Sequence, residues 1–190
     1  MKKIIIPILI LIFSMSLFSA DTDKEMAKKF KLRVQTDNKK GVTTYTPKGA
    51  SARSRIFLYM VKNDGSGQIT LRLRIAYFAE SMLFIKRYIL YADDRELVLP
   101  VRGQVRMQDL GRMNLAGTTG NQVSGGVCEY YDIAVDSTEI DIMEQIAAAK
   151  SAKMRYEGNK GYKKVKIHKG EVKDIKRVLE AFEALTKNKE

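Results

Sequence analysis

Residues 56–75, IFLYMVKNDGSGQITLRLRI, contain two runs of alternating apolar and polar residues that flank a turn-forming segment. Alternation with a period of two continues from Ile69 to Tyr77, which is the pattern of a strand with one buried face. The intervening NDGSG segment tolerates positive φ and is typical of a tight turn. If Lys62 pairs with Ile69, the apolar residues of both runs share one face, whereas a slip of one residue would separate them. The stretch therefore predicts an antiparallel hairpin in a single register.

Similar patterns elsewhere predict further strands. Residues 83–91 and 96–101 are rich in β-branched and aromatic residues, and the segment ADDR at 92–95 is expected to close a second hairpin between them. Residues 127–135 are expected to form another strand, with Tyr131 and Ile133 on one side. The middle of the chain is therefore predicted to build an antiparallel sheet or sandwich.

The first 20 residues, MKKIIIPILILIFSMSLFSA, have two lysines, then an apolar run, then small residues before a polar segment. This layout is typical of a secretory signal peptide. The apolar run is shorter than the about 20 residues that a spanning helix needs, and the alternative is an uncleaved N-terminal membrane anchor. We therefore expect a periplasmic or secreted protein whose mature chain contains no spanning helix.

The only cysteine, Cys128, is not at the end of that apolar run, where a bacterial lipoprotein would need one. A single cysteine cannot form an internal disulfide, so an apolar core must hold the mature chain together. Because Cys128 lies in an apolar segment, we expect a buried and unreactive thiol.

The remainder of the chain divides by composition. Residues 21–49 are polar and lysine-rich and predict a loosely held N-terminal arm with short strands at 30–36 and 42–46. Residues 50–190 are expected to form a single α+β domain. Within it, residues 111–126 contain five glycines and no clear periodicity. Long loops in compact domains are usually functional or disordered, so this loop is a candidate flap over a cleft.

Two helices are predicted in the C-terminal half. The segment DSTE at 136–139 has the form of a capping box at the start of a helix that continues to about residue 150. The apolar faces of the two helices comprise Ile140, Met143, Ile146 and Ala147 in the first and Val172, Ile175, Val178, Leu179, Phe182 and Leu185 in the second. The predicted fold class is therefore α+β, with an antiparallel β-sheet or sandwich and two helices in the C-terminal half.

Positive charge is concentrated between these helices. The whole chain has a net charge of +12, and residues 150–177 carry eleven Lys or Arg against three acids. Residues 152–156 and 164–168 alternate, so a hairpin would bury its apolar residues and place the cations on its other face. The candidate anion-binding residues are Lys153, Arg155, Lys164, Lys166 and His168. The alternative is a solvated face, which is the commoner fate of a lysine-rich surface.

A second surface is expected on the first hairpin. In the proposed register Tyr59 lies across from Arg72, and Phe57 lies across from Arg74, on the face opposite the core. Such pairs are compatible with cation–π contacts. The alternative is an ordinary strand surface or a face covered by a helix.

The sequence lacks the motifs of the common catalytic centres. With His168 as the only histidine and one cysteine, neither a multi-histidine metal site nor a Cys/His zinc cluster can form. The motifs G-x-S-x-G, H-E-x-x-H and G-x-x-x-x-G-K-[ST] are absent. Glu129 and Asp132 are three residues apart and should lie on opposite faces of their strand. We therefore expect no catalytic residue, metal or cofactor, and the sequence favours a protein that is not an enzyme.

The C-terminal segment from Glu139 to Leu185 combines a capped helix, an A-K-S-x-x-x-R-Y-x-G strand, a second strand and an amphipathic last helix. In this order it resembles the closing module of small exported bacterial proteins of unassigned function. The resemblance implies a bacterial envelope or periplasmic setting and transfers no catalytic residue.

Three functional hypotheses follow. The first is an exported, non-enzymatic envelope protein that binds an anionic envelope polymer, a lipid headgroup or an acidic protein through the basic hairpin. The second is a small-ligand carrier or a carboxylate-based hydrolase with a cleft under the 111–126 loop, and the third is a structural subunit of an envelope complex. Binding of nucleic acid would need aromatic rings among the cations, and the expected export argues against it.

Overall fold

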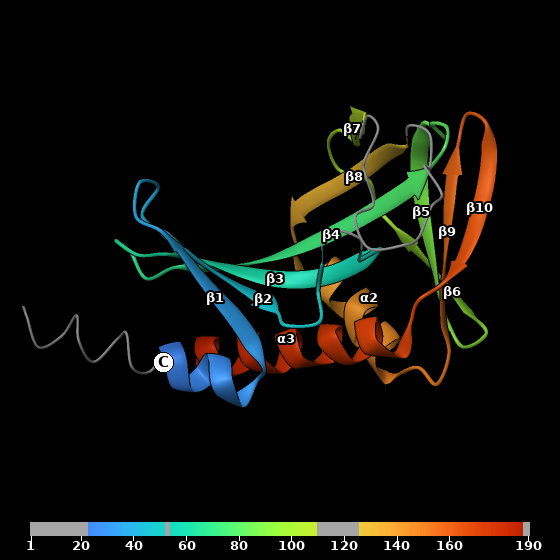
Figure 1. Cartoon of the computed structure of the whole chain (residues 1–190). Helices are drawn as coiled ribbons and strands as arrows, with labels where there is room; N and C mark the ends of the chain where they lie inside the picture. Colours follow the sequence, from blue (N-terminus) through green and yellow to red (C-terminus); the bar gives the residue numbers. More distant parts are fainter. Residues whose placement is uncertain (1–22, 52–53, 110–125, 188–190) are drawn as a thin grey trace, which may run out of the picture.

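The computed structural model describes residues 23–51, 54–109 and 126–187, and within these residues ten strands form two antiparallel sheets (Figure 1). The six-stranded sheet contains, in spatial order, β1 (Leu32–Asp37), β2 (Val42–Pro47), β3 (Ile56–Asn63), β4 (Ile69–Ala79), β8 (Val127–Ala134) and β7 (Arg106–Asp109). The four-stranded sheet contains β10 (Gly161–Lys166), β9 (Ala152–Gly158), β5 (Ile85–Ala92) and β6 (Arg95–Leu99). With two helices in the C-terminal half, α2 (Ser137–Ala148) and α3 (Lys169–Lys187), the fold is α+β, as predicted.

The hairpin predicted within residues 56–75 forms in the predicted register. Lys62 pairs with Ile69 and Leu58 pairs with Leu73, so the apolar residues of β3 and β4 share the core face. The second predicted hairpin is also present, because Tyr91 of β5 pairs with Glu96 of β6. Asp93 closes its turn with a φ of 53°, a conformation that Asp tolerates better than most residues.

The two helices pack against each other, with α3 on the six-stranded sheet and α2 next to the four-stranded sheet. The helix α3 contacts β2 and β3, and α2 lies beside α3 and reaches β5 and β6 (Figure 1). The predicted capping box begins α2: Asp136 accepts a hydrogen bond from the backbone N–H of Thr138, and Glu139 accepts one from the backbone N–H of Asp136. Arg102 forms ion pairs with both acids, which attaches the start of the helix to the segment after β6.

Tyrosines join the inner faces of the two sheets. Tyr156 of β9 is buried between Tyr77 of β4, with ring centroids 5.1 Å apart, and Tyr88 of β5, at 6.0 Å. Its hydroxyl donates to the backbone carbonyl of Ala76, 2.9 Å away. This bond connects the four-stranded sheet to the six-stranded one, and it satisfies a polar group that would be costly to bury alone.

A buried carboxylate, which the sequence did not reveal, fixes the start of β5. Glu129 of β8 is 1% exposed and accepts backbone hydrogen bonds from Leu83, Phe84 at 3.1 Å and Ile85 at 2.8 Å. Phe84 has a φ of 56°, so the chain turns there. The strand therefore begins at Ile85, two residues later than the alternation predicted.

The N-terminal segment contributes directly to the larger sheet. Residues 23–29 form a short helix, β1 pairs with β2, and β2 pairs with β3. Leu32 and Tyr45 from this segment are buried in the core. The predicted signal peptide at 1–20 and all but the last residue of the 111–126 loop lie outside the described residues. Among the residues that are described, no helix is both long enough and apolar enough to cross a membrane.

Candidate functional site: a cationic sheet face

Strands β9 and β10 form the basic hairpin, with the alternating cations on one face as predicted. Lys153 lies opposite Lys166, and Arg155 lies opposite Lys164. The alternate residues of β9, which are Ala152, Met154 and Tyr156, are buried in the core. The four cationic side chains therefore lie together on the outer face of the four-stranded sheet, which we call the cationic face.

The neighbouring strand β5 adds residues to this face that the local sequence pattern does not predict. On the same face, β5 places Tyr91 beside Lys153, Ile89 beside Arg155 and Arg87 beside Glu157. This pairing joins residues more than 60 positions apart, so no local sequence signal could have indicated it. Ile89 is buried, so the cationic face gains aromatic surface from Tyr91 in addition to its charge.

Acidic side chains neutralise only part of this charge. Glu157 forms ion pairs with Arg155, at 2.8 Å, and with Arg87, at 3.7 Å. Within the described ranges, no ion pair involves Lys153, Lys164 or Lys166. Three ammonium groups on neighbouring strands therefore lack an acidic partner there.

Arg155 is held in place more firmly than the lysines. Its guanidinium lies 5.9 Å from the ring centroid of Tyr91 and 6.0 Å from that of Tyr162, in addition to the ion pair with Glu157. Lys164 also lies over the Tyr91 ring, at 5.4 Å. Such cation–π contacts are worth roughly 0.5–1 kcal/mol at exposed sites. The rings therefore keep the positive charges oriented on the face, and Tyr162 is itself 68% exposed.

The fifth predicted residue, His168, lies beyond the end of β10 and has a structural contact. It directly precedes α3, and its backbone N–H donates to Glu171 at 2.9 Å, the backbone half of a capping box. Its Nε2 is 3.2 Å from the guanidinium of Arg55, which also donates to the carbonyl of Lys166. Because arginine can only donate, Nε2 accepts in this contact. Arg55 is a further cation at this end of the face, brought there from the start of β3.

The second predicted surface is partly as expected. Arg72 lies 5.9 Å from the ring centroid of Tyr59, and both side chains hydrogen-bond to Asp132 of β8. Arg74, however, lies over Tyr130 of β8 at 5.0 Å, not over Phe57. The pairing of β4 with β8 was not available from the sequence, and it brings Tyr130 next to this arginine. Since Asp132 neutralises Arg72, this surface carries less free charge than the cationic face.

The remaining candidates for reactive chemistry occupy separate places. Glu129 is buried on the core side of β8, whereas Asp132 is half-buried on the other side, as predicted. Cys128 is buried, and burial raises the pKa of its thiol, which disfavours the reactive thiolate. In the part of the chain that the structure covers, no group of three His, Cys, Asp or Glu side chains could hold a metal ion.

The geometry of the cationic face suits contact with several negative charges at once. Neighbouring strands are about 4.8 Å apart and alternate residues on one strand about 6.8 Å apart, so the four cations occupy the corners of a small rectangle. The face belongs to a sheet, and no described helix covers it in Figure 1. Comparisons with protein-family models, curated protein sequences and solved structures found no match.

Proposed function

We propose that this protein is a non-enzymatic component of the bacterial envelope that binds an anionic polymer through the cationic face. The observation that carries the proposal is the group of three ammonium ions, from Lys153, Lys164 and Lys166, that have no acidic partner in the described structure. The export signal expected at residues 1–20 and the resemblance to exported bacterial proteins supply the location.

The lysines on β10 have an explanation other than ligand binding. β10 is an edge strand, and natural proteins place lysine on edge strands to prevent pairing with another chain. That explanation accounts for Lys164 and Lys166. It does not account for Lys153 and Arg155, because β9 is paired on both sides, with β10 and with β5. The charge on the interior strand therefore supports a ligand for the face as a whole.

The distribution of the charge favours a polymer over a single small anion. Tight sites for one phosphate or carboxylate use arginine forks, and the one arginine among the four cations is already engaged by Glu157. Lysines spread over two strands instead contact successive charges of an extended chain, each weakly. The binding energy then depends on the number of contacts and falls steeply with salt.

The test compares two variants that lose the same charge. In the first, Lys153, Lys164 and Lys166 are replaced by serine; in the control, the exposed lysines Lys24, Lys39 and Lys173 are replaced. On immobilised heparin, the first variant is expected to elute at clearly lower salt than the control. The slope of log affinity against log salt should fall by about three units. Arg155 is left in place, so that its contacts with Tyr91 and Tyr162 remain intact.

Equal elution of the two variants, with unchanged circular dichroism, would refute the proposal. Vesicles with anionic headgroups and a polyglutamate column distinguish the other two ligand classes. Binding to vesicles that depends on the three lysines, without binding to heparin, would assign the face to a lipid surface. The corresponding result with polyglutamate alone would assign it to an acidic protein.

A further inference from the structure

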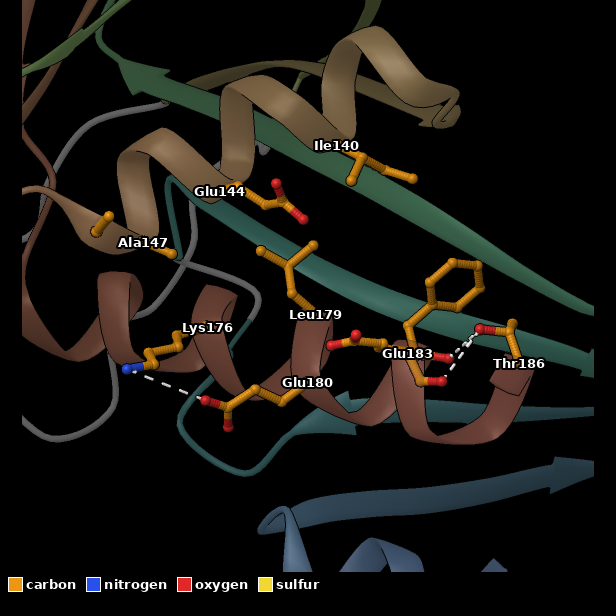
Figure 2. Close-up of a pocket in the computed structure, with 10 residues that line it drawn as sticks. Ile140, Glu144, Ala147, Lys176, Leu179, Glu180, Glu183 and Thr186 are labelled. Atoms are coloured by element: carbon orange, nitrogen blue, oxygen red, sulfur yellow. Dashed lines mark hydrogen bonds and ion pairs between the residues drawn. The ribbon is translucent and has the colours of Figure 1, made fainter. Parts of the chain in front are cut away.

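A groove of about 460 Å³ lies between α2 and α3, on the solvent side of the helix pair (Figure 2). Its apolar lining includes Ile140 and Ala147 from α2 and Leu179 and Phe182 from α3. Its acidic lining comprises Glu144, Glu180 and Glu183. In Figure 2 the two helices run side by side, with Glu144 and Leu179 in the space between them and Lys176 and Glu180 along α3.

The apolar lining packs against the core but is only partly covered by it. Of the apolar face expected on α3, Ile175 and Val178 are fully buried, whereas Leu179 and Phe182 remain only half-buried. On α2, Met143 and Ile146 are fully buried, whereas Ile140 and Ala147 are half-buried. Each helix therefore has an apolar stripe that is wider than the sheet beneath it can cover. The two uncovered margins meet in the groove.

The charge at the groove is opposite to that of the molecule. The chain has a net charge of +12, yet the groove is lined by three glutamates and a single cation, Lys176. Lys176 pairs with Glu180 at 4.0 Å, and both side chains are largely exposed. Glu144 has no ion pair in the described part of the chain. An acidic, apolar surface on a basic protein is complementary to a ligand that is both cationic and apolar.

We propose that this groove is a docking site for a cationic amphipathic helix of a partner protein. A groove between two helices that lie side by side can accept a third helix. The apolar side chains with which the third helix binds recur at intervals of three, four and seven residues. α2 has 12 residues, so the groove is about 18 Å long, the length of three helical turns. Apolar anchors of the ligand would contact Leu179 and Phe182, and its lysines or arginines would contact Glu144 and Glu180. This inference does not depend on the cationic face.

The probe is a labelled 15-residue helical peptide of leucine and lysine with leucines spaced i, i+3, i+4 and i+7. Titration into the full mature chain, followed by fluorescence anisotropy, measures its affinity. The groove variant carries Glu144→Lys and Glu180→Lys, and the matched control carries Glu25→Lys and Asp94→Lys, which change the net charge equally at exposed positions elsewhere. We expect the groove variant to bind at least about tenfold more weakly than the control variant.

Two further measurements distinguish the contribution of apolar contacts to peptide binding from that of charge. A peptide of the same composition in scrambled order should bind at least about tenfold more weakly than the amphipathic peptide, and Phe182→Ala, checked by circular dichroism, should weaken binding without any change in charge. Equal affinity of the groove and control variants, or of the ordered and scrambled peptides, would overturn the proposal. Concentration-dependent self-association that only the groove variant abolishes would also overturn it, because a second copy would then be the occupant. The cationic face repels the lysine-rich peptide, so binding there does not contribute to the measured affinity.

Discussion

At the scale of single residues, buried polar groups decide where the chain turns. Glu129 is almost fully buried and still accepts three backbone hydrogen bonds from residues 83–85. Those three amides would otherwise lie in the interior without acceptors, and unsatisfied buried donors are expensive. The carboxylate therefore determines the position at which β5 starts and at which the chain passes from one sheet to the other.

Replacing Glu129 by glutamine should destabilise the protein by about 2–4 kcal/mol, because a neutral amide oxygen accepts these bonds less strongly and its NH₂ group faces other donors. Chemical denaturation monitored by circular dichroism measures the change. Glu80→Gln, a matched change at an exposed carboxylate, should leave the free energy of unfolding within about 0.5 kcal/mol of the wild type. A loss no larger than that of the control would show that the three amides find other acceptors.

Tyr59 gives a prediction for alkaline pH. Burial and the neighbouring negative charge of Asp132 raise the pKa of its phenol from 10.0 to about 12. Below pH 10 both the folded and the unfolded states hold the proton, and the stabilisation is complete. Between pH 10 and 12 the unfolded state releases the proton while the folded state keeps it, so the free energy of unfolding falls as the pH rises.

The variant Tyr59→Phe separates the pH-dependent stabilisation by Tyr59 from that of the other buried tyrosines. At pH 9 the variant should be the less stable protein, because it lacks the hydrogen bonds to Asp132 and from Arg72. The difference in free energy of unfolding between wild type and variant should narrow as the pH approaches 11.5, as measured by urea denaturation. A difference that stays constant over this range would contradict the raised pKa.

At the scale of elements, the β9–β10 hairpin combines good strand pairing with unfavourable charge. Lys153 directly opposes Lys166, and Arg155 opposes Lys164, and like charges in this position destabilise a sheet. The hairpin persists because its other face buries Met154 and Tyr156 in the core. Binding of the proposed anionic ligand would offset this local cost in stability.

Replacing both Lys153 and Lys166 by threonine should therefore stabilise the protein, by about 0.5–1 kcal/mol at low salt. The gain should shrink in 1 M NaCl, where the Debye length is about 3 Å. Lys163→Thr is the control, because Lys163 lies opposite Tyr156 and not opposite another cation. If the double variant and the control gave the same stability change per residue, repulsion across the strands would not be the cause.

At the scale of the whole molecule, the N-terminal segment is part of the main sheet. Its strand β2 pairs with β3 and contacts α3, and its residues Leu32 and Tyr45 are buried. A further link is the ion pair between Asp23 and Lys62, at 2.6 Å. Removal of this segment would expose the edge of β3 together with part of the core, and exposed edges promote aggregation.

A chain that begins at residue 48 should therefore fail to form a folded monomer. Size-exclusion chromatography and thermal denaturation would show aggregates or a broad, non-cooperative transition. The control is a chain that begins at residue 21, which retains every described residue and should melt cooperatively as a monomer. Native-like melting of the shorter chain would show that residues 21–47 are an appendage to an independent domain.

Sequence alone determined the local structure of this protein wherever a pattern repeats within a few residues. The registers of the two middle hairpins, the capping box at Asp136 and the placement of four cations on one side of β9 and β10 all follow from alternation or from helix chemistry. Only the tertiary structure decided which distant segments meet. It placed Tyr91 beside the cations, Tyr130 under Arg74, Glu129 against residues 83–85, and two apolar helix margins around one acidic groove. The physical reason is that periodicity tells which face of an element is buried, whereas the partner of that face is chosen by the packing of the whole chain.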